Sequence, residues 1–531
     1  MNRKKLVISV IVLSFALVLA GATAMSQEAK QGGTLELVSS DEAELLDPIT
    51  YELIESIRRM ELIYDSLLEF NPDGEVIPSL AKELPERPDE DTMIFHIHEG
   101  VKFHDGTELT AEDVKYTFDS IGDSDEGSSH YDMIKDSVES IEVVDDYTVK
   151  FNMEKVTPVS IVTPFFRGIV SKEAREEMGA DDYADDPIGS GPFKLVEWKK
   201  DDYMLLERNE DYWMKKPNLD KVRFNVVPEK STQVIRLLTG EIDIAGIPNN
   251  LLEKVENSDS AEMLKYPGYH YAGMIFNMEK PPFDDKKVRK AIHYLVDREE
   301  IMQAAAGELG RLNWSITPPI VNENWDFPQE EWKQYLPEPD LEKAKELLDE
   351  ADLTGNPRFE VTLEGLSTAY YPHITTVMQN QLEKANIKVE VRNRDLGSWL
   401  EELDTTGTVE DPGPLEEQYS MIVYGWGAGP DPDEWLYPQF YSTVAQEPNT
   451  AQFSDSEVDE WLEKARYSID REERRELYIK AQTKILEAYP HIPLFNDLNA
   501  VGVSNRVQDY QPTPGSGRVP LVTPFSNVWV E

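Results

Sequence analysis

The order of hydrophobic segments in the second half of the chain restricts the fold more than any other feature. Residues 359–363 (FEVTL) and 387–391 (IKVEV) have the composition of β-strands, and a helical pattern at 375–384 lies between them. The mostly apolar run 419–424 (YSMIVY), which is bounded by glycine, is typical of a buried strand. A strand, a helix, a second strand and then a buried strand predict a parallel α/β unit.

Strand and helix signals also alternate in the rest of the chain. Residues 34–38 (TLELV) alternate apolar and polar side chains, as a half-buried strand does. Thr110 and Asp113 have the spacing of a capping box, and Asp284 or Asp285 can cap a further amphipathic helix. We therefore expect an α/β protein, and 531 residues are enough for roughly two to four domains.

The charge of the chain excludes one class of partner. The 52 Lys and Arg residues against 102 Asp and Glu residues give a formal net charge of −50. Such a surface repels phosphate groups, so we expect no nucleic-acid partner. An excess of carboxylates also suits a saline habitat, where salt screens their mutual repulsion.

The first 24 residues have the layout of a secretory signal peptide. A positive leader at 3–5 (RKK) precedes the apolar stretch 6–20, and small residues in an A-x-A pattern end at Ala24. We predict cleavage after Ala24, and an uncleaved membrane anchor is the alternative because the apolar run approaches spanning length. The position that would carry the lipid of a lipoprotein is Ala22, and the chain has no cysteine. We therefore expect an exported, periplasmic protein without a lipid anchor.

The sequence carries no recognisable catalytic motif. It lacks a G-x-S-x-G elbow, an H-E-x-x-H zinc motif and a phosphate-binding P-loop. Residues 425–429 (GWGAG) resemble a dinucleotide-binding turn, but Pro430 and Pro432 disfavour a helix start there. Asp431 and Asp433 would in addition repel a pyrophosphate. We expect no enzymatic activity, no catalytic residue and no cofactor.

Three histidines, at positions 96, 98 and 104, lie close together in the sequence. Two of them would share one face of a strand, so a metal site is conceivable. No carboxylate is placed to complete a set of three ligands, which favours ordinary strand and turn histidines. We expect no metal site.

Five segments carry the signature of a known family. They are 99–114 (EGVKFHDGTELTAEDV), 188–213 (IGSGPFKLVEWKKDDYMLLERNEDYW), 238–243 (LTGEID), 276–297 (FNMEKPPFDDKKVRKAIHYLVD), and Gly425-Trp426 with Asp431-Pro432-Asp433. Their order and spacing cover nearly all of the chain after the signal peptide. Together they resemble the large solute-binding proteins of ABC importers of the oligopeptide, dipeptide and nickel class, known as extracellular solute-binding protein family 5.

The resemblance implies a periplasmic-binding-protein type II clamshell of the large class, which has an extra subdomain. Lobe I would comprise residues 32–276, with the subdomain inserted at about 51–187, and residues 496–531 would return to it. Lobe II would comprise residues 277–495. The chain then crosses between the lobes twice, and two adjacent crossings form a hinge.

The resemblance also implies a ligand site in the cleft between the lobes. In peptide-binding members, the backbone of the loop after a central lobe II strand pairs with the ligand. That loop maps to Gly425, Trp426, Gly427, Ala428 and Gly429, where glycine permits close approach and the indole offers a flat apolar wall. Further candidates are Tyr271 and Asn277 beside the first crossing, and Val38, Ser39 and Ser40 at the end of the first strand.

One departure from the family affects the expected ligand. The acid that meets a peptide's amino group in many members would fall at Gly429, which has no side chain. A charged amine without a partner is costly to bury. Either Asp431 or Asp433 replaces this acid, or the ligand has no free amine.

The family implies an extracytoplasmic component of an ABC importer that captures oligopeptides and delivers them to a membrane permease. We expect it to act as a monomer. Three alternatives remain open: an oligosaccharide-binding protein of the same fold, a nickel or metal-chelate binder and, from another class, an exported hydrolase. The 10 Trp and 23 Tyr residues suit stacking on sugar rings as well as a large core.

Overall fold

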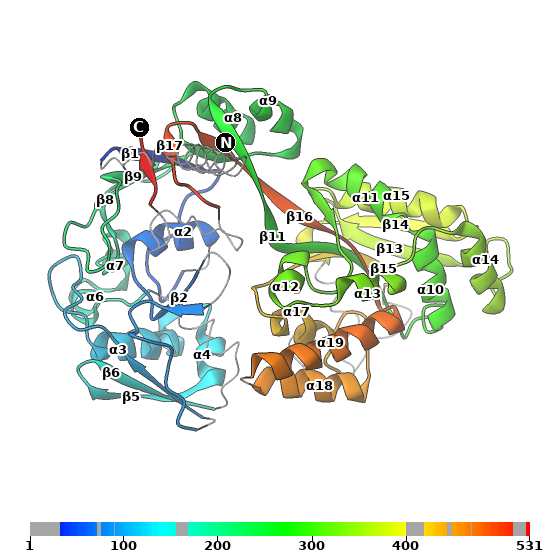
Figure 1. The fold of residues 1–531 in the computed structure, drawn as a ribbon, viewed down its shortest axis with the longest axis horizontal. Helices are drawn as coiled ribbons and strands as arrows, with labels where there is room; N and C mark the ends of the chain where they lie inside the picture. The colour runs from blue at the N-terminus through cyan, green and yellow to red at the C-terminus, as the bar shows by residue number, and fades with distance from the viewer. Residues whose placement is uncertain are drawn as a thin grey trace, which may run out of the picture.

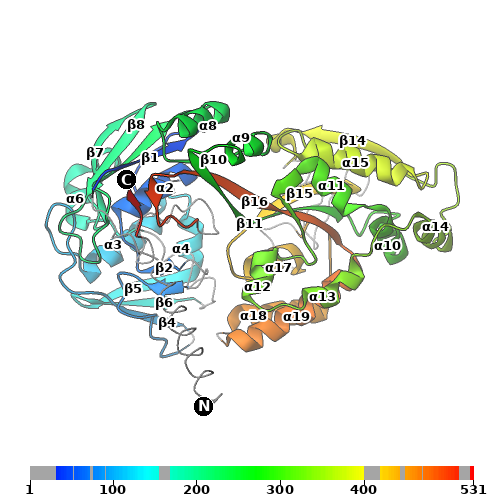
Figure 2. The same ribbon diagram turned by 45° about the horizontal axis from the view of Figure 1, so that its top comes forward.

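Two bodies of mixed helices and strands are joined by two long strands (Figures 1 and 2). We call them the N-terminal body (residues 32–260 and 505–531) and the C-terminal body (residues 277–490). The joining strands are β11 (Ala261–Phe276) and β16 (His491–Ser504). The computed structural model describes residues 32–51, 53–71, 76–89, 91–154, 168–399, 419–442, 449–468, 470–512 and 527–531. The predicted signal peptide lies outside these residues.

The N-terminal body contains more strands than the C-terminal body. Its strands are β1 (Thr34–Ser39), β2 (Leu68–Phe70), β3 (Val76–Pro78), β4 (Thr92–His96), β5 (Val138–Asp145), β6 (Thr148–Met153), β7 (Phe193–Lys199), β8 (Tyr203–Arg208), β9 (Lys221–Val226), β10 (Ile244–Gly246), β17 (Val507–Gln508) and β18 (Trp529–Val530). Its helices are α2 (Ile54–Ile63), α3 (Ala111–Ile121), α4 (Tyr131–Ser137), α6 (Lys172–Met178), α7 (Ala180–Asp185), α8 (Lys230–Thr239) and α9 (Leu252–Glu256).

The C-terminal body is richer in helix. Its strands are β12 (Gly310–Leu312), β13 (Glu360–Leu366), β14 (Lys388–Arg394) and β15 (Met421–Gly427). Its helices are α10 (Lys286–Leu295), α11 (Arg298–Ala305), α12 (Pro319–Asn324), α13 (Gln329–Trp332), α14 (Leu341–Glu350), α15 (Tyr371–Glu383), α17 (Asp433–Phe440), α18 (Ser456–Tyr467) and α19 (Arg471–Ala488).

One sheet of eleven described strands continues through both bodies. Its order is β14-β13-β15-β11-β16-β10-β1-β9-β8-β7, and β12 pairs with β16 beside this path. β13 is parallel to both β14 and β15, which confirms the parallel α/β unit predicted for the second half of the chain. β11 and β16 are antiparallel neighbours in the middle of the sheet.

Local sequence signals explain where several helices begin. The N–H of Thr110 donates to the Asp113 carboxylate at 2.9 Å, which is one half of the predicted capping box at the start of α3. Asp285 accepts the N–H of Lys287 at 2.7 Å and so caps α10, as one of the two predicted candidates. These interactions satisfy N–H groups that the first turn of a helix leaves free.

The apolar core of the C-terminal body lies on both faces of its sheet. Met274 and Phe276 of β11 pack into one cluster with α10, α14 and α15, while Tyr271 and Ile275 pack into another with α17, α18 and α19. Successive side chains of a strand point to opposite faces, which produces this division. The result is a three-layer arrangement, helices–sheet–helices (Figure 1).

The pairing of the two joining strands is interrupted between the bodies. Pro267 pairs with Leu498 and Tyr271 with Asn496, so three residues of β11 stand opposite one residue of β16. Extra residues of this kind form a bulge, which bends a strand. The lobe boundaries expected at 276 and 495 stay a prediction.

Candidate ligand-binding site

The residues predicted to bind a ligand fall at the carboxyl ends of two strands in different bodies. Gly425, Trp426 and Gly427 are the last residues of β15, and Ala428 and Gly429 follow it. The expected loop is therefore partly strand: Gly425 pairs with Ala272 and Gly427 with His270 of β11. In α/β sheets, ligands bind outside the carboxyl ends of the strands, which makes this edge the candidate site.

Tyr271 and Asn277 lie behind this edge rather than on it. Both side chains are completely buried. The Tyr271 hydroxyl donates to the Gln439 side-chain oxygen at 3.1 Å, and the Asn277 side chain accepts the N–H of Glu279 at 3.1 Å. In this conformation they support the sheet from within.

The predicted residues on the N-terminal body lie at the end of β1. Val38 and Ser40 are half-buried, and Ser39 is buried. The Ser39 hydroxyl accepts a hydrogen bond from the buried guanidinium of Arg59 at 2.9 Å. The Ser40 hydroxyl accepts one from Gln233 at 3.2 Å, so the side chains of both serines are engaged within the protein.

The segment after β15 turns directly into a helix. Pro430 and Pro432 were expected to prevent a helix start, and that expectation is wrong, because α17 begins at Asp433 immediately after Pro432. Proline is compatible with the first positions of a helix, where its missing N–H is not needed. Two indole N–H groups stabilise the turn by hydrogen bonds to its backbone. Trp435 donates to the Gly429 carbonyl at 2.8 Å, and Trp426 donates to the Glu434 carbonyl at 3.3 Å.

Two of the three acids in this turn are paired with arginines. Asp431 accepts two hydrogen bonds from Arg474 of α19, at 2.7 and 2.9 Å. Asp433 is buried and lies 3.2 Å from Arg466 of α18. Asp431, a predicted ligand residue, is thus engaged in a bidentate ion pair inside the C-terminal body.

Glu434 is the third acid, and it occupies the space beside Gly429. Its carboxylate accepts the N–H of Gly429. A Cβ atom built at Gly429 would lie 2.3 Å from a Glu434 carboxylate oxygen, so Glu434 fills the place that a side chain at 429 would take. The sequence predicts Asp431 or Asp433 here and not Glu434, because the helix start that orients Glu434 follows Pro432 and was not predicted.

Neighbouring side chains of the protein also explain why position 425 is glycine. A Cβ atom there would lie 2.3 Å from the Tyr371 hydroxyl and 2.5 Å from His270 Nε2. His270 in turn lies 2.7 Å from Asp497, and the Tyr370 hydroxyl donates to the same carboxylate at 2.9 Å. The sequence does not predict this group, because its members are far apart along the chain.

The histidines at 96, 98 and 104 do not form a common site. His96 contacts Thr148 and Glu86, His98 packs against Trp213, and His104 Nε2 lies 3.0 Å from the Gly191 carbonyl. Within the described ranges, no three His, Cys, Asp or Glu side chains are grouped so that they could hold a metal ion.

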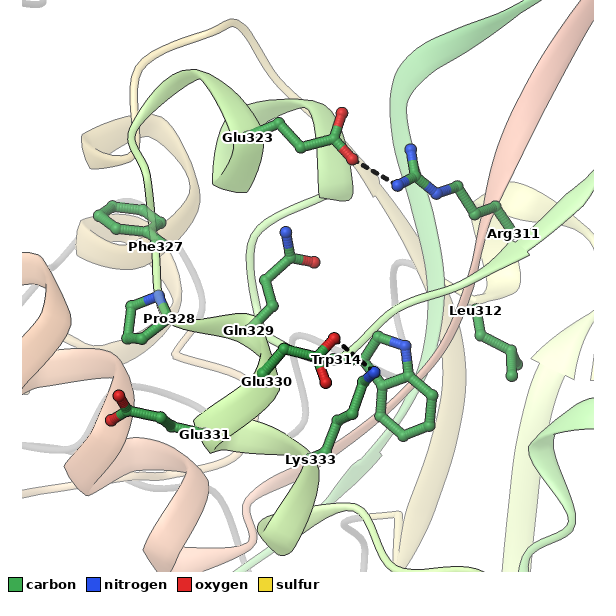
Figure 3. Close-up of a pocket in the computed structure, with 10 residues that line it drawn as sticks. All are labelled: Arg311, Leu312, Trp314, Glu323, Phe327, Pro328, Gln329, Glu330, Glu331 and Lys333. Atoms are coloured by element: carbon green, nitrogen blue, oxygen red, sulfur yellow. Dashed lines mark hydrogen bonds and ion pairs between the residues drawn. The ribbon is translucent and has the colours of Figure 1, made fainter.

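A pocket of about 520 Å³ lies elsewhere, between β12 and helices α12 and α13 (Figure 3). Arg311 faces Glu323 across it, and Lys333 pairs with Glu330 at 2.6 Å below Trp314. None of the predicted ligand residues lines it. Since its cations are already neutralised by acids, we place the candidate site at the end of β15 instead.

The acids of the turn are expected to make stability depend on pH. Burial raises the pKa of Asp433 to about 7 and that of Glu434 to about 8, and the charge of Asp431 adds to both shifts. Unfolded carboxyls ionise near pH 4, so between about pH 4 and pH 8 these two groups hold more protons in the folded chain than in the unfolded chain. The free energy of unfolding should therefore fall by about 1.5 kcal/mol between pH 7 and 8.5.

Urea unfolding at constant ionic strength measures this effect. Glu434→Gln should flatten the dependence, whereas Glu463→Gln, at an exposed position on α18, should leave it unchanged. A stability that rises with pH in the unmodified chain would contradict the expected shifts.

Comparison with known proteins identifies the class of this molecule. Two mixed bodies joined by paired strands form the type II periplasmic-binding-protein fold. The ABC transporter-associated periplasmic binding protein DppA of Helicobacter pylori, solved with the peptide STSA, has this fold; it matches with a TM-score of 0.72 and 28% identity, over 96% of this chain and 100% of that one. This confirms the predicted fold class.

Residues 75–447 match the middle region of family 5 of the bacterial extracellular solute-binding proteins, and the chain belongs to this family. Heme-binding protein A of Haemophilus influenzae is 28% identical over 480 residues, which cover 85% of each chain. The oligopeptide-binding protein AppA of Bacillus subtilis is 28% identical over 514 residues, 91% of this chain and 90% of AppA. The predicted family is confirmed, and these relatives are binding proteins.

Proposed function

We propose that the chain is the solute-binding component of an ABC importer and that its ligands are oligopeptides. The observation that supports this most is an open strand edge. β15 pairs with β11 from Met421 to Gly427, but with β13 only at Met421 and Ile422. Among the described strands, none covers the other edge of β15 from 423 to 427. An extended peptide can pair with such an edge through its backbone, whatever its side chains are.

The side chains around this edge suit a ligand of variable composition. Trp426 is half-buried, and Tyr269 of β11 belongs to the same apolar cluster. Aromatic surfaces make large contacts without demanding one partner shape. The names of relatives agree in part, because AppA of Bacillus subtilis is an oligopeptide-binding protein while another relative binds heme.

The same proposal includes the cellular setting and the way of closing. Residues 1–24 direct export to the periplasm, no lipid anchor is attached, and the protein works as a monomer that catalyses no reaction. Lobe I (32–276 and 496–531, with the subdomain 51–187) closes on lobe II (277–495) about the bulge in β11, and ligand biases the balance of open and closed forms. Among the described residues, no helix is both long and apolar enough to cross a membrane.

Thermal unfolding with a ligand panel tests the ligand class. Peptides of several lengths should raise the melting temperature, because a ligand that binds only the folded state stabilises it. Cello-, xylo- and manno-oligosaccharides and a nickel–histidine chelate complete the panel. A rise in melting temperature with sugars alone or with the chelate alone would favour the oligosaccharide or metal-chelate alternative over oligopeptides. Turnover of any peptide or sugar would favour the alternative of an exported hydrolase.

Trp426→Ala should weaken peptide binding about tenfold to a hundredfold in calorimetric titrations, since buried aromatic contacts dominate such interfaces. Trp461→Ala is the matched control, because Trp461 of α18 is also half-buried but lies outside the edge of β15. Equal affinity for the Trp426 variant and the unmodified chain would remove Trp426 from the site.

A further inference from the structure

The joint between the two bodies lies at the break in the pairing of β11 and β16. On one side of the break, both strands belong to the sheet of the N-terminal body, where β10 pairs with β16. On the other side they belong to the sheet of the C-terminal body, where β15 pairs with β11 and β12 with β16. The last pair of the first side is Pro267 with Leu498, and the first pair of the second side is Tyr271 with Asn496. A single residue of β16, Asp497, lies between these pairs, so the strand passes from one body to the other at Asp497.

A bond between side chains replaces the backbone pairing at this break. His270 pairs with Gly427 of β15, and Asp497 pairs with Gly310 of β12, so each is joined to the C-terminal body on its outer side. Between them, His270 Nδ1 lies 2.7 Å from the Asp497 carboxylate. A carboxylate only accepts hydrogen bonds, so the imidazole N–H donates. The row of the sheet that the backbone leaves open is thus closed by the two side chains.

Two further contacts hold this pair in place. The hydroxyl of Tyr370, the residue before α15, donates to the same Asp497 carboxylate at 2.9 Å. Burial, with the charge of Asp497 second, raises the pKa of Tyr370, so the hydroxyl keeps its proton and remains a donor. The Asn496 side chain donates to the His270 carbonyl at 2.8 Å. Asp497 is therefore fastened to the C-terminal body by two donors from two different elements.

The other side of the joint has fewer restraints. Pro267 has no N–H to donate to a neighbouring strand. Gly268 follows it, and a Cβ atom built there would lie 3.0 Å from the Asn499 side-chain nitrogen and 3.3 Å from the Asp497 carbonyl oxygen. Glycine thus allows β11 to lie close to β16 here, and it tolerates the changes in backbone angles that a hinge requires.

We infer that the two bodies turn at the break next to Asp497, and that His270 and Tyr370 are positioning residues that restrict this turn by holding its carboxylate. This inference rests on the proposed function, because it states how the proposed binding site opens and closes. With both donors in place, Asp497 is fixed to the C-terminal body and β16 bends only beyond it. When a donor is lost, Asp497 can move away from β11, and the bodies adopt a wider range of relative orientations.

The proposed binding edge and this joint share one residue. His270 is the pairing partner of Gly427, the last residue of β15, and a Cβ atom built at Gly425 would lie 2.5 Å from His270 Nε2. A ligand that pairs with the edge of β15 would therefore lie beside the group that restricts the turn. A wider range of orientations contains a smaller fraction of the form that binds, and the apparent affinity falls with that fraction.

Distances between two spin labels on the full chain, measured by pulsed electron paramagnetic resonance, report the range of orientations. The chain has no cysteine, so Asp136→Cys on α4 and Glu463→Cys on α18 provide the only two attachment sites. Both positions are exposed, and the two helices lie in different bodies, below the joining strands in Figure 1. Tyr370→Phe and His270→Leu should each broaden the distance distribution of the ligand-free chain. A residue that only contacted the ligand would leave this width unchanged.

Peptide affinity is the second readout, measured by calorimetric titration with tetra-alanine and the other peptides of the thermal panel. Tyr370→Phe and His270→Leu should each weaken binding about threefold to tenfold, which corresponds to one lost hydrogen bond. Tyr335→Phe is the matched control, because the Tyr335 hydroxyl also donates to a carboxylate at 2.9 Å, that of Glu487, within the C-terminal body. It should change neither the width nor the affinity.

The two readouts separate the inference from the proposed function. Peptides that bind the unmodified chain, while both variants keep its ligand-free width, would overturn the inference and leave the proposed function standing. Broadened distributions in both variants, without binding of any peptide to the unmodified chain, would support the role of the group at Asp497 and overturn the proposed ligands. Unchanged widths without peptide binding would overturn both.

Discussion

Gly189→Ala is expected to lower the free energy of unfolding by about 2–4 kcal/mol, because the added methyl group has no room. A Cβ atom built at Gly189 lies 2.0 Å from the carbonyl oxygen of Ile63. That oxygen belongs to the backbone at the end of α2, so no side-chain rotation can relieve the overlap. The N–H of Gly191 donates to the same carbonyl at 2.8 Å, which holds the two segments at this distance. Urea unfolding at constant pH and salt measures the loss.

Gly246→Ala is the matched control for this substitution. Gly246 is the last residue of β10, and a Cβ atom there has no neighbour within 4 Å. The free energy of unfolding of the Gly246→Ala variant should change by less than about 0.5 kcal/mol, as at other surface positions. Equal losses at 189 and 246 would show that the contact with Ile63 relaxes at little cost.

The contact of Gly189 with α2 shows what a sequence motif can and cannot reveal. The segment 188–213 helped to indicate the family. In the structure, Gly189 and Gly191 of this segment lie against the backbone of Ile63 at the end of α2. Ser190, between them, donates to the buried carboxylate of Asp65 at 3.0 Å. The motif shows a resemblance to the family. Why position 189 must be glycine is visible only in the structure, where Ile63, more than a hundred residues earlier in the chain, leaves no room for a side chain.

Local signals predicted much of the fold. The capping box at Thr110, the cap at Asp285 and the strand patterns of β13 and β14 each depend on neighbours within a few residues, so they can be read from the sequence. The extension of β15 through Gly427 could not be predicted from the sequence, because glycine disfavours strands. Its pairing partner, His270 of β11, lies far away in the sequence.

Only part of the candidate site could be predicted, because some of its contacts depend on residues that are distant in the sequence. Trp426 and its glycines were found through resemblance, but the orientation of Glu434 toward Gly429 depends on where α17 begins. That start follows Pro432, a residue that was expected to disfavour a helix there. The pairing of Asp431 with Arg474 is a contact between two elements, and no local pattern encodes it.

Arg474→Met should cost about 3–5 kcal/mol of stability at pH 8, because it leaves the carboxylate of Asp431 without its counter-charge. Arg474 is buried, and besides its two bonds to Asp431 it donates to the Ala465 carbonyl at 3.0 Å and the Tyr478 hydroxyl at 2.9 Å. Methionine fills similar volume but supplies no donor. Because the charge of Arg474 lowers the pKa of Asp433, its removal should raise that pKa further. Urea unfolding at pH 8 and pH 5 measures the effect.

The loss should be smaller at pH 5 than at pH 8, because burial raises the pKa of Asp433 to about 7 and that of Glu434 to about 8, so both are protonated at pH 5 and add no negative charge beside Asp431. Lys480→Met, at an exposed position of the same helix, should change stability by less than about 0.5 kcal/mol at either pH. Asp431→Asn introduced with Arg474→Met should recover part of the loss, because it removes the unpaired charge and couples to the first substitution. An Arg474→Met penalty that is identical at both pH values and unaffected by Asp431→Asn would mean that Arg474 stabilises the turn through packing alone.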